Sequence, residues 1–334
     1  MAKVIIGIHG LGNKPSKEIL EKWWRMAIEE GLIKAGHQIK PFIFELVYWA
    51  DLMYEKPLDL EISDKDSPYY LLQKYMPGPE ILFGEDHPKR KKILDFLTKQ
   101  LDSIFLNEDF SLNYTYLTDT ILQRYFKDLD IYYKEKCKDE DAQKCEIKKV
   151  IRQRTKTILE KYKKDEIVLI GHSMGSIIAY DVLSFSEPAT PVNTFITIGS
   201  PLGIPIVKSK IAKELEQNHF NKTQLTTPPS VFKNWFNFSD IEDKVAIDYQ
   251  LGDDFAENKL HVKPIDFEVY NDYTINGERN PHKSYGYLRT PKFSEKINEF
   301  LQYRKPTVWN KLTSNIRKLL IKQARQASRH PQHL

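Results

Sequence analysis

The chain has 334 residues, of which 41% are hydrophobic and 29% are charged, and its formal net charge at pH 7 is +4. This composition excludes a disordered chain and predicts a folded globular protein of one or two domains. No stretch approaches the roughly eighteen consecutive apolar residues that a membrane-spanning helix requires, so we expect none.

The chain opens on a short apolar strand and a glycine-rich loop. Residues 3–8 (KVIIGI) predict a buried strand, and residues 9–13 (HGLGN) follow it directly. Because this apolar run is too short for a secretory signal, we expect a cytoplasmic protein.

A helix and a second strand come next. Residues 15–35 place apolar side chains three and four positions apart, Pro15 suits a first turn, and Gly36 can end the helix. Residues 41–49 (PFIFELVYW) are rich in aromatic and branched side chains and predict the second strand.

Residues 51–146 are predicted to be an inserted cap. The third strand falls at 167–170, and a parallel crossover needs only about a dozen residues, which a helix at 147–164 supplies. A structureless loop as long as the remainder is implausible inside a domain. We predict a helical lid, with amphipathic helices at 91–106 and 114–133 that either roof an active site or fill a core of their own.

The two cysteines, Cys137 and Cys145, lie in a charged stretch of this insertion. In a cytoplasmic protein we expect them to be free thiols. No pair of histidines accompanies them at zinc spacing, so the sequence predicts no metal site, and it predicts no cofactor.

Residues 171–175 (GHSMG) are the most informative stretch. An apolar strand precedes them and a helical pattern follows, which is the setting of a nucleophile elbow that pushes Ser173 into the open at the sheet edge. A side chain at Gly171 or Gly175 would collide with a neighbouring strand or helix. The alternative is an ordinary turn between a strand and a helix.

An elbow serine needs an oxyanion hole, and two backbone amides are predicted to form it. One is the N–H of Met174, the residue after the serine, and the other is the N–H of Leu11 in the first glycine-rich loop. Such donors typically contribute about 3–4 kcal/mol each to lowering the barrier. His9 precedes the serine in the chain and is interpreted as a structural or positioning residue, not the base.

The acid is expected after the serine, at the end of a later strand. After the next strand at 192–198 and a polar loop at 218–230, residues 235–238 (WFNF) predict a strand that Asp240 and Asp243 follow. Either carboxylate could orient a histidine, and we favour Asp243. The other would then be an ordinary turn aspartate.

His282 is the predicted base. It lies in a loop after the last predicted strand, at 265–270, whereas His261 precedes that strand and would reach the wrong edge of the sheet. Residues 291–303 predict the closing helix. The alternation of strands and helices predicts an α/β fold with a mostly parallel sheet and helices on both faces, with residues 1–50 and 147–303 as its core.

Residues 304–334 form a basic tail. They contain eight Lys or Arg and no Asp or Glu, which leaves 42 basic against 46 acidic residues in the rest of the chain. Apolar side chains fall on one helical stripe, so the tail predicts an amphipathic helix that either contacts a membrane surface or an acidic partner, or packs on the core. The charge is confined to one short segment without a binding motif, so we expect no nucleic-acid partner.

The chain resembles an α/β-hydrolase of the serine esterase or lipase type. The residues that carry the resemblance are 4–13, 171–175, 198–203, 237–246 and 282–287. Residues 235–240 with 243–246 are also similar to a segment of DDHD-type phospholipases. The resemblance implies the hydrolase fold and a Ser–Asp–His triad, and it leaves the substrate open.

Together these patterns predict a serine hydrolase of carboxylic esters that works through an acyl-enzyme. Ser173 attacks, His282 transfers the proton and Asp243 holds the ring. Lipid or phospholipid esters are the first expectation and short-chain esters or thioesters the second. The alternative class is a non-catalytic protein that docks a partner on the same fold.

Overall fold

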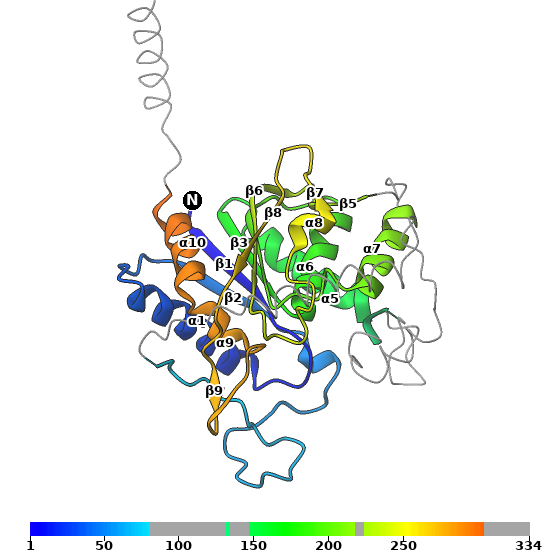
Figure 1. Cartoon of the computed structure of the whole chain (residues 1–334). Coiled ribbons are helices and arrows are strands. Elements are labelled where there is room, and N and C mark those ends of the chain that lie inside the picture. The colour runs from blue at the N-terminus through cyan, green and yellow to red at the C-terminus, as the bar shows by residue number, and fades with distance from the viewer. Residues whose placement is uncertain (80–130, 134–146, 218–223, 304–334) are drawn as a thin grey trace, which may run out of the picture.

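The computed structural model describes residues 1–79, 131–133, 147–217 and 224–303. Six strands of these residues form one parallel sheet, which lies between two layers of helices (Figure 1). In spatial order the strands are β2 (Ile43–Val47), β1 (Lys3–Ile8), β3 (Glu166–His172), β4 (Val192–Ile198), β6 (Val231–Ser239) and β8 (Pro264–Glu268). The predicted fold class is therefore confirmed.

The direction of winding reverses beside the first strand. The chain runs from β1 outward to β2, returns past β1 to β3, and then adds β4, β6 and β8 on the far side. β1 pairs with both β2 and β3, and all these pairings are parallel. The loops after β1 and β3 thus leave the same edge of the sheet in opposite directions, which is where open parallel sheets bind ligands.

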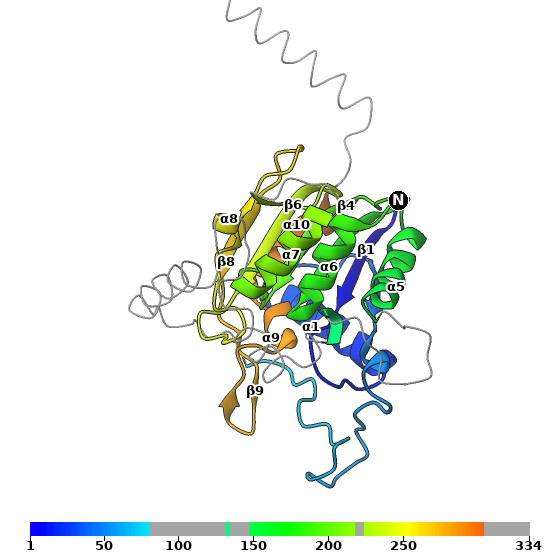
Figure 2. The same ribbon diagram turned by 90° about the vertical axis from the view of Figure 1, so that its right-hand side faces the viewer.

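Each face of the sheet has its own apolar core. On one face lie α1 (Lys17–Lys34), α9 (Ser284–Leu288) and α10 (Pro291–Gln302), packed against Ile5 and Val168 among others. On the other lie α5 (Ile147–Lys161), α6 (Met174–Phe185) and α7 (Pro205–Gln217), packed against Ile6 and Leu169. Figure 2 shows the second layer from its outer side. Side chains alternate between the faces, so strands covered on both sides are apolar throughout.

Gly36 lies just past the end of α1 as expected, whereas Pro15 lies before the helix and not in its first turn, because Ser16 is the N-cap. Ser16 caps the helix by accepting a hydrogen bond from the Ile19 N–H, and Gly36 just past the end has φ +74°, in the left-handed region that favours glycine. The strands predicted at 3–8, 41–49, 192–198 and 265–270 and the helices predicted at 147–164 and 291–303 are likewise present, with ends that differ by a few residues.

Several short elements were not predicted. They are α7, α8 (Leu251–Asp254), the parallel pair β5 (Leu225–Thr226) and β7 (Phe255–Ala256), and the hairpin β9 (Thr274–Ile275) and β10 (Glu278–Arg279). β5 corrects part of the loop predicted at 218–230. β5 and β7 pair across about thirty residues of chain, and strands of two residues leave no periodic pattern in the sequence.

Most of the predicted cap lies outside the described residues, as do Cys137, Cys145 and the basic tail. Of the insertion, residues 53–79 are irregular apart from an isolated bridge between Asp59 and Tyr70, after a single 3-10 turn (Ala50–Leu52). Residues 131–133 are helical. None of the helices described here has the length and hydropathy of a membrane span.

Candidate active site

Ser173 stands at a sharp turn between β3 and α6. Its φ of +53° and ψ of −128° are rare for a residue with a side chain, and the tight turn imposes them. The Ser173 N–H donates to the Ile198 carbonyl, which ties the turn to the neighbouring strand. This backbone geometry is the one expected of a nucleophile elbow, and the role of Ser173 as a nucleophile stays a prediction.

The two glycines of the motif are required by close contacts. A Cβ at Gly175 would lie 2.2 Å from the Ile8 carbonyl oxygen of β1, and one at Gly171 would lie 2.5 Å from the Cα of Ser176 in α6. Both distances are far below any van der Waals contact. The collisions expected from the sequence are therefore confirmed.

A cavity of about 230 Å³ opens at this edge of the sheet. Ser173, His282 and Leu11 line it together with Gln73, from the described start of the insertion. Ser173 is only 1% exposed and forms part of the cavity wall. The sequence-based expectation that it projects into the open is therefore wrong. The reason is that the loops after β1 and β8 fold over the turn.

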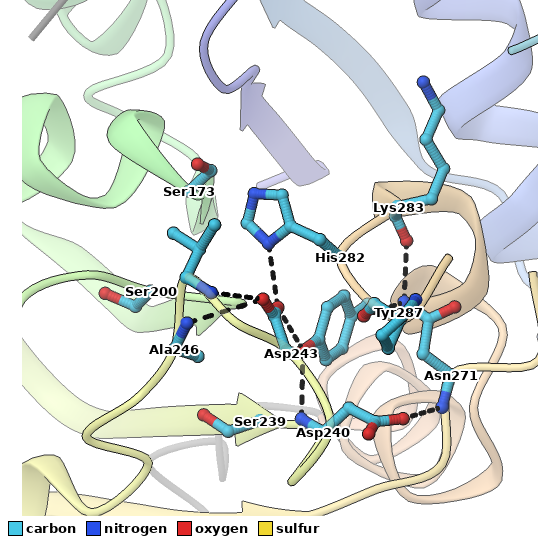
Figure 3. Close-up of polar contacts among 12 residues, drawn as sticks. Ser173, Ser200, Ser239, Asp240, Asp243, Ala246, Asn271, His282, Lys283 and Tyr287 are labelled. Atoms are coloured by element: carbon cyan, nitrogen blue, oxygen red, sulfur yellow. Dashed lines mark hydrogen bonds and ion pairs between the residues drawn. The ribbon is translucent and has the colours of Figure 1, made fainter. Parts of the chain in front are cut away.

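His282 and Asp243 lie within hydrogen-bonding distance. The Nδ1 atom of His282 is 2.8 Å from Oδ2 of Asp243 (Figure 3), and the carboxylate is fully buried while 28% of the imidazole is exposed. A carboxylate can only accept, so Nδ1 carries the proton and Nε2 is left as an acceptor. No hydrogen bond joins Ser173 to His282 among the described residues. Such bonds often form only when substrate is bound.

The carboxylate of Asp243 accepts four hydrogen bonds. Oδ2 also accepts from the Tyr287 hydroxyl at 2.7 Å, and Oδ1 accepts from the N–H groups of Val245 and Ala246 at 2.9 and 3.4 Å. Gly199 leaves room for the pair, because a Cβ there would lie 2.8 Å from Oδ2 of Asp243 and 3.2 Å from Nδ1 of His282. Its φ of +52° also favours glycine.

Asp240 has a different role. It accepts from the guanidinium of Arg279 at 2.7 Å and from the N–H groups of Asn271 and Glu242 at 2.7 and 2.8 Å. The structure therefore brings Asp243, the favoured candidate, to His282 and leaves Asp240 as a buried anchor of the loops.

Asn271 clamps the loop that carries His282. Its side-chain amide donates to the carbonyls of Pro281 and Lys283, at 2.8 Å each, one on either side of the histidine. Tyr287 and Asn271 were not identified from the sequence, because a side chain acting through tertiary contacts has no local signal. The segment predicted as a loop also contains α9, which begins at Ser284.

Two further histidines of the described residues, His9 and His172, are buried and held by hydrogen bonds. His9 is buried and stacked on Trp49, with its Nε2 accepting from the Trp49 N–H at 3.0 Å, in line with the positioning role expected for it. His172 donates from Nε2 to the His282 carbonyl at 2.7 Å. Burial lowers the pKa of both rings well below the usual value. His261 is exposed and pairs with Glu257.

The two predicted oxyanion donors stand at the ends of adjacent loops. Met174 is the first residue of α6, and the first N–H groups of a helix have no partner within it. Leu11 lines the cavity, and its carbonyl accepts from the ammonium of Lys14, which holds this loop. That the Leu11 and Met174 amides bind an oxyanion stays a prediction.

Residues 120–227, about a third of the chain, match the PGAP1-like alpha/beta domain family, which is of the α/β-hydrolase type. The match includes the turn at Ser173 but neither Asp243 nor His282. No curated protein matches the chain. The parallel sheet, its two helical layers and this match together show a fold of the α/β-hydrolase type.

Proposed function

We propose that the protein is a serine hydrolase that cleaves carboxylic esters through an acyl-enzyme. The observation that carries the proposal is the hydrogen bond of 2.8 Å between Asp243 and His282, because His282 lines the same cavity as Ser173, a serine with elbow geometry. The three proposed residues also follow one another in the chain in the order serine, aspartate, histidine, which is the order of α/β-hydrolases.

The roles follow from the chemistry of each group. The Ser173 Oγ attacks the acyl carbonyl while Nε2 of His282 takes its proton. The imidazolium gives this proton to the leaving alcohol as the tetrahedral intermediate collapses to the acyl-enzyme. His282 then deprotonates a water molecule, which releases the acid and restores Ser173. Asp243 keeps the proton on Nδ1 and stabilises the imidazolium.

The amides of Leu11 and Met174 are the proposed oxyanion donors. Both would meet the carbonyl oxygen as it becomes negative, and each such donor is typically worth about 3–4 kcal/mol of barrier. Lipid or phospholipid esters are the first substrate class, on the basis of the apolar patterns at 91–106 and 114–133 and the basic tail. Short-chain esters or thioesters are the second.

A fluorophosphonate probe tests this function directly. We expect covalent labelling of the full-length protein at Ser173, located by mass spectrometry of the digested protein, because only an activated serine reacts quickly. Ser173→Ala should abolish labelling. Ser63→Ala, at an exposed position, is the matched control and should label like the native protein.

Two outcomes would count against the proposal. Native protein that stays unlabelled, while folded by circular dichroism, would favour a partner-binding protein on a hydrolase fold. Labelling that persists in Ser173→Ala would place the reactive serine elsewhere.

A further inference from the structure

The cavity beside Ser173 is lined by two lysines. Lys14 comes from the loop after β1, and Lys283 directly follows His282. The part of the cavity lining that the structure describes contains no Asp or Glu. Asp243 is hydrogen-bonded to His282 and is not among the residues that line the cavity. The described lining is therefore cationic.

The ammonium group of Lys283 is held by neutral groups. Its Nζ donates to Oε1 of Gln73 at 3.0 Å and lies 5.1 Å from the centre of the Tyr285 ring. Figure 3 shows its side chain extending away from Asp243. Within the described residues it has no ion pair, although it is partly buried. A charge in such a place is unfavourable unless a counter-ion joins it.

The charge of Lys14 acts on Lys283, and the charges of both lysines act on the ring of His172, which lines the same cavity. Burial, together with repulsion from Lys14, lowers the pKa of Lys283 to about 7. Both ammonium charges also act to lower the pKa of His172, after burial and the neighbouring His282. Positive potential is thus concentrated at the place where an ester must approach, and walls of low dielectric focus such a field.

An anion in the cavity would relieve this repulsion. An ammonium group binds carboxylate or phosphate oxygens as a compact charge with three donors, and Lys283 already presents its donors to the cavity. The amide of Gln73 and the ring of Tyr285 hold the lysine in place, so little side-chain freedom is left to lose on binding.

We propose that Lys283, supported by Lys14, forms a subsite for an anionic group of the substrate, so that the enzyme prefers carboxylic esters bearing a carboxylate or phosphate near the scissile bond. This subsite rests on the proposed function, since it concerns the substrate of the same serine. The subsite specifies that this substrate is anionic, a property that the fold alone does not determine.

Matched pairs of esters test the subsite. The first pair is mono-p-nitrophenyl glutarate against p-nitrophenyl pentanoate, which have equal chain length and differ in one carboxylate. The second is 1-pentanoylglycerol 3-phosphate against 1-pentanoylglycerol, so the two pairs separate a carboxylate on the acyl side from a phosphate on the alcohol side. We expect the native kcat/KM to be higher for the anionic member of at least one pair.

The decisive quantity is the ratio of kcat/KM for the anionic ester to that for the neutral ester. Lys283→Met should lower this ratio roughly tenfold, because a hydrogen bond to a charged group is lost, and Lys283→Arg should restore part of it. Lys259→Met is the matched control. It removes an exposed lysine before β8, at the opposite edge of the sheet, and should leave the ratio unchanged.

Failure of the subsite and failure of the enzyme can be told apart. A native protein that labels at Ser173 and cleaves the neutral esters, but has a ratio of one or less for both pairs, would overturn the subsite alone. So would an unchanged ratio in Lys283→Met. If there is no labelling and no turnover of any ester, the proposed function itself is wrong.

The pH dependence gives an independent measurement. The groups facing Lys283 are Lys14, the rings of His172, His282 and Tyr285, and the neutral Gln73. A lysine is charged below its pKa, so the glutarate-to-pentanoate ratio should fall as pH rises from about 6 to about 8. The substrate carboxylate stays ionised over this range and the effect of His282 cancels in the ratio. A ratio that does not change with pH would contradict the role of Lys283.

Discussion

Asp243 and Asp240 each accept four hydrogen bonds, but only Asp243 accepts from a histidine. Four donors surround it, and two of them, His282 Nδ1 and the Tyr287 hydroxyl, share the single oxygen Oδ2. The Tyr287 hydroxyl in turn accepts from the Asp240 N–H at 2.9 Å, so the two aspartates are connected through one buried phenol. Burial and the charge of Asp243 raise the pKa of Tyr287 well above its usual value, which keeps the phenol a donor.

The two aspartates should respond differently to neutralisation. Asp243→Asn should lower kcat/KM for p-nitrophenyl pentanoate by about 10⁴-fold, because an amide cannot keep the proton on His282 Nδ1. Asp240→Asn should instead lower the melting temperature, because it weakens the pair with Arg279, and should cost less than about tenfold in rate. Steady-state kinetics and thermal unfolding of both variants measure this. The reverse ranking in rate would show that Asp240 is the functional acid.

At the scale of elements, the site depends on how closely α6 approaches β1. The helix starts immediately after Ser173, and Gly175 in its first turn lies against the carbonyl of Ile8. The same contact brings the β1 loop, with Leu11, next to the elbow. One small residue therefore sets how near Ser173 lies to the β1 loop, whose Leu11 amide is a proposed oxyanion donor.

Two Gly→Ala substitutions separate this contact from ordinary backbone effects. Within a helix, alanine is normally about 1 kcal/mol better than glycine, yet Gly175→Ala should destabilise the protein by about 3 kcal/mol or more because its Cβ has no room. Gly36→Ala, where nothing lies within 4 Å of the new Cβ, should cost only about 1 kcal/mol for its positive φ. Urea unfolding measures both free energies. Equal costs would mean that α6 can move away from β1.

At the scale of the molecule, the site lies where the winding of the sheet reverses. The loop after β1 carries Leu11, the loop after β3 carries Ser173, and loops after β6 and β8 bring Asp243 and His282 across. Gln73 at the cavity, and Tyr132 bound to Asp181 of α6 at 2.6 Å, attach the two described parts of the insertion to the core.

The basic tail is predicted to strengthen binding to membrane surfaces and to have no effect on the rate of ester hydrolysis. Deleting residues 305–334 should weaken binding to vesicles of anionic lipid, because the seven Lys or Arg of this segment, without an acidic residue, favour a negative surface. Turnover of p-nitrophenyl pentanoate should not change. Vesicle sedimentation and a soluble ester assay measure the two effects. Unchanged vesicle binding would remove the membrane interpretation of the tail.

The sequence alone determined the parallel fold and the turn at Ser173. Fully apolar strands such as 3–8 can only be covered on both faces, and a G-x-S-x-G between strand and helix follows from local steric limits. It also narrowed the acid to two candidates and the base to one, because chain order along a wound sheet restricts which loop can reach the serine.

Only the tertiary structure shows that Asp243 contacts His282 while Asp240 contacts Arg279, since both aspartates follow the same strand and differ only in which loop faces them. It likewise revealed the contacts of Tyr287 and Asn271 and the position of Lys283 in the same cavity lining as Ser173. These residues act across gaps of ten or more positions, and a hydrogen bond or a shared cavity between such distant side chains leaves no periodicity in the chain. Local patterns specify elements, whereas the charge and geometry of a site arise where separate elements meet.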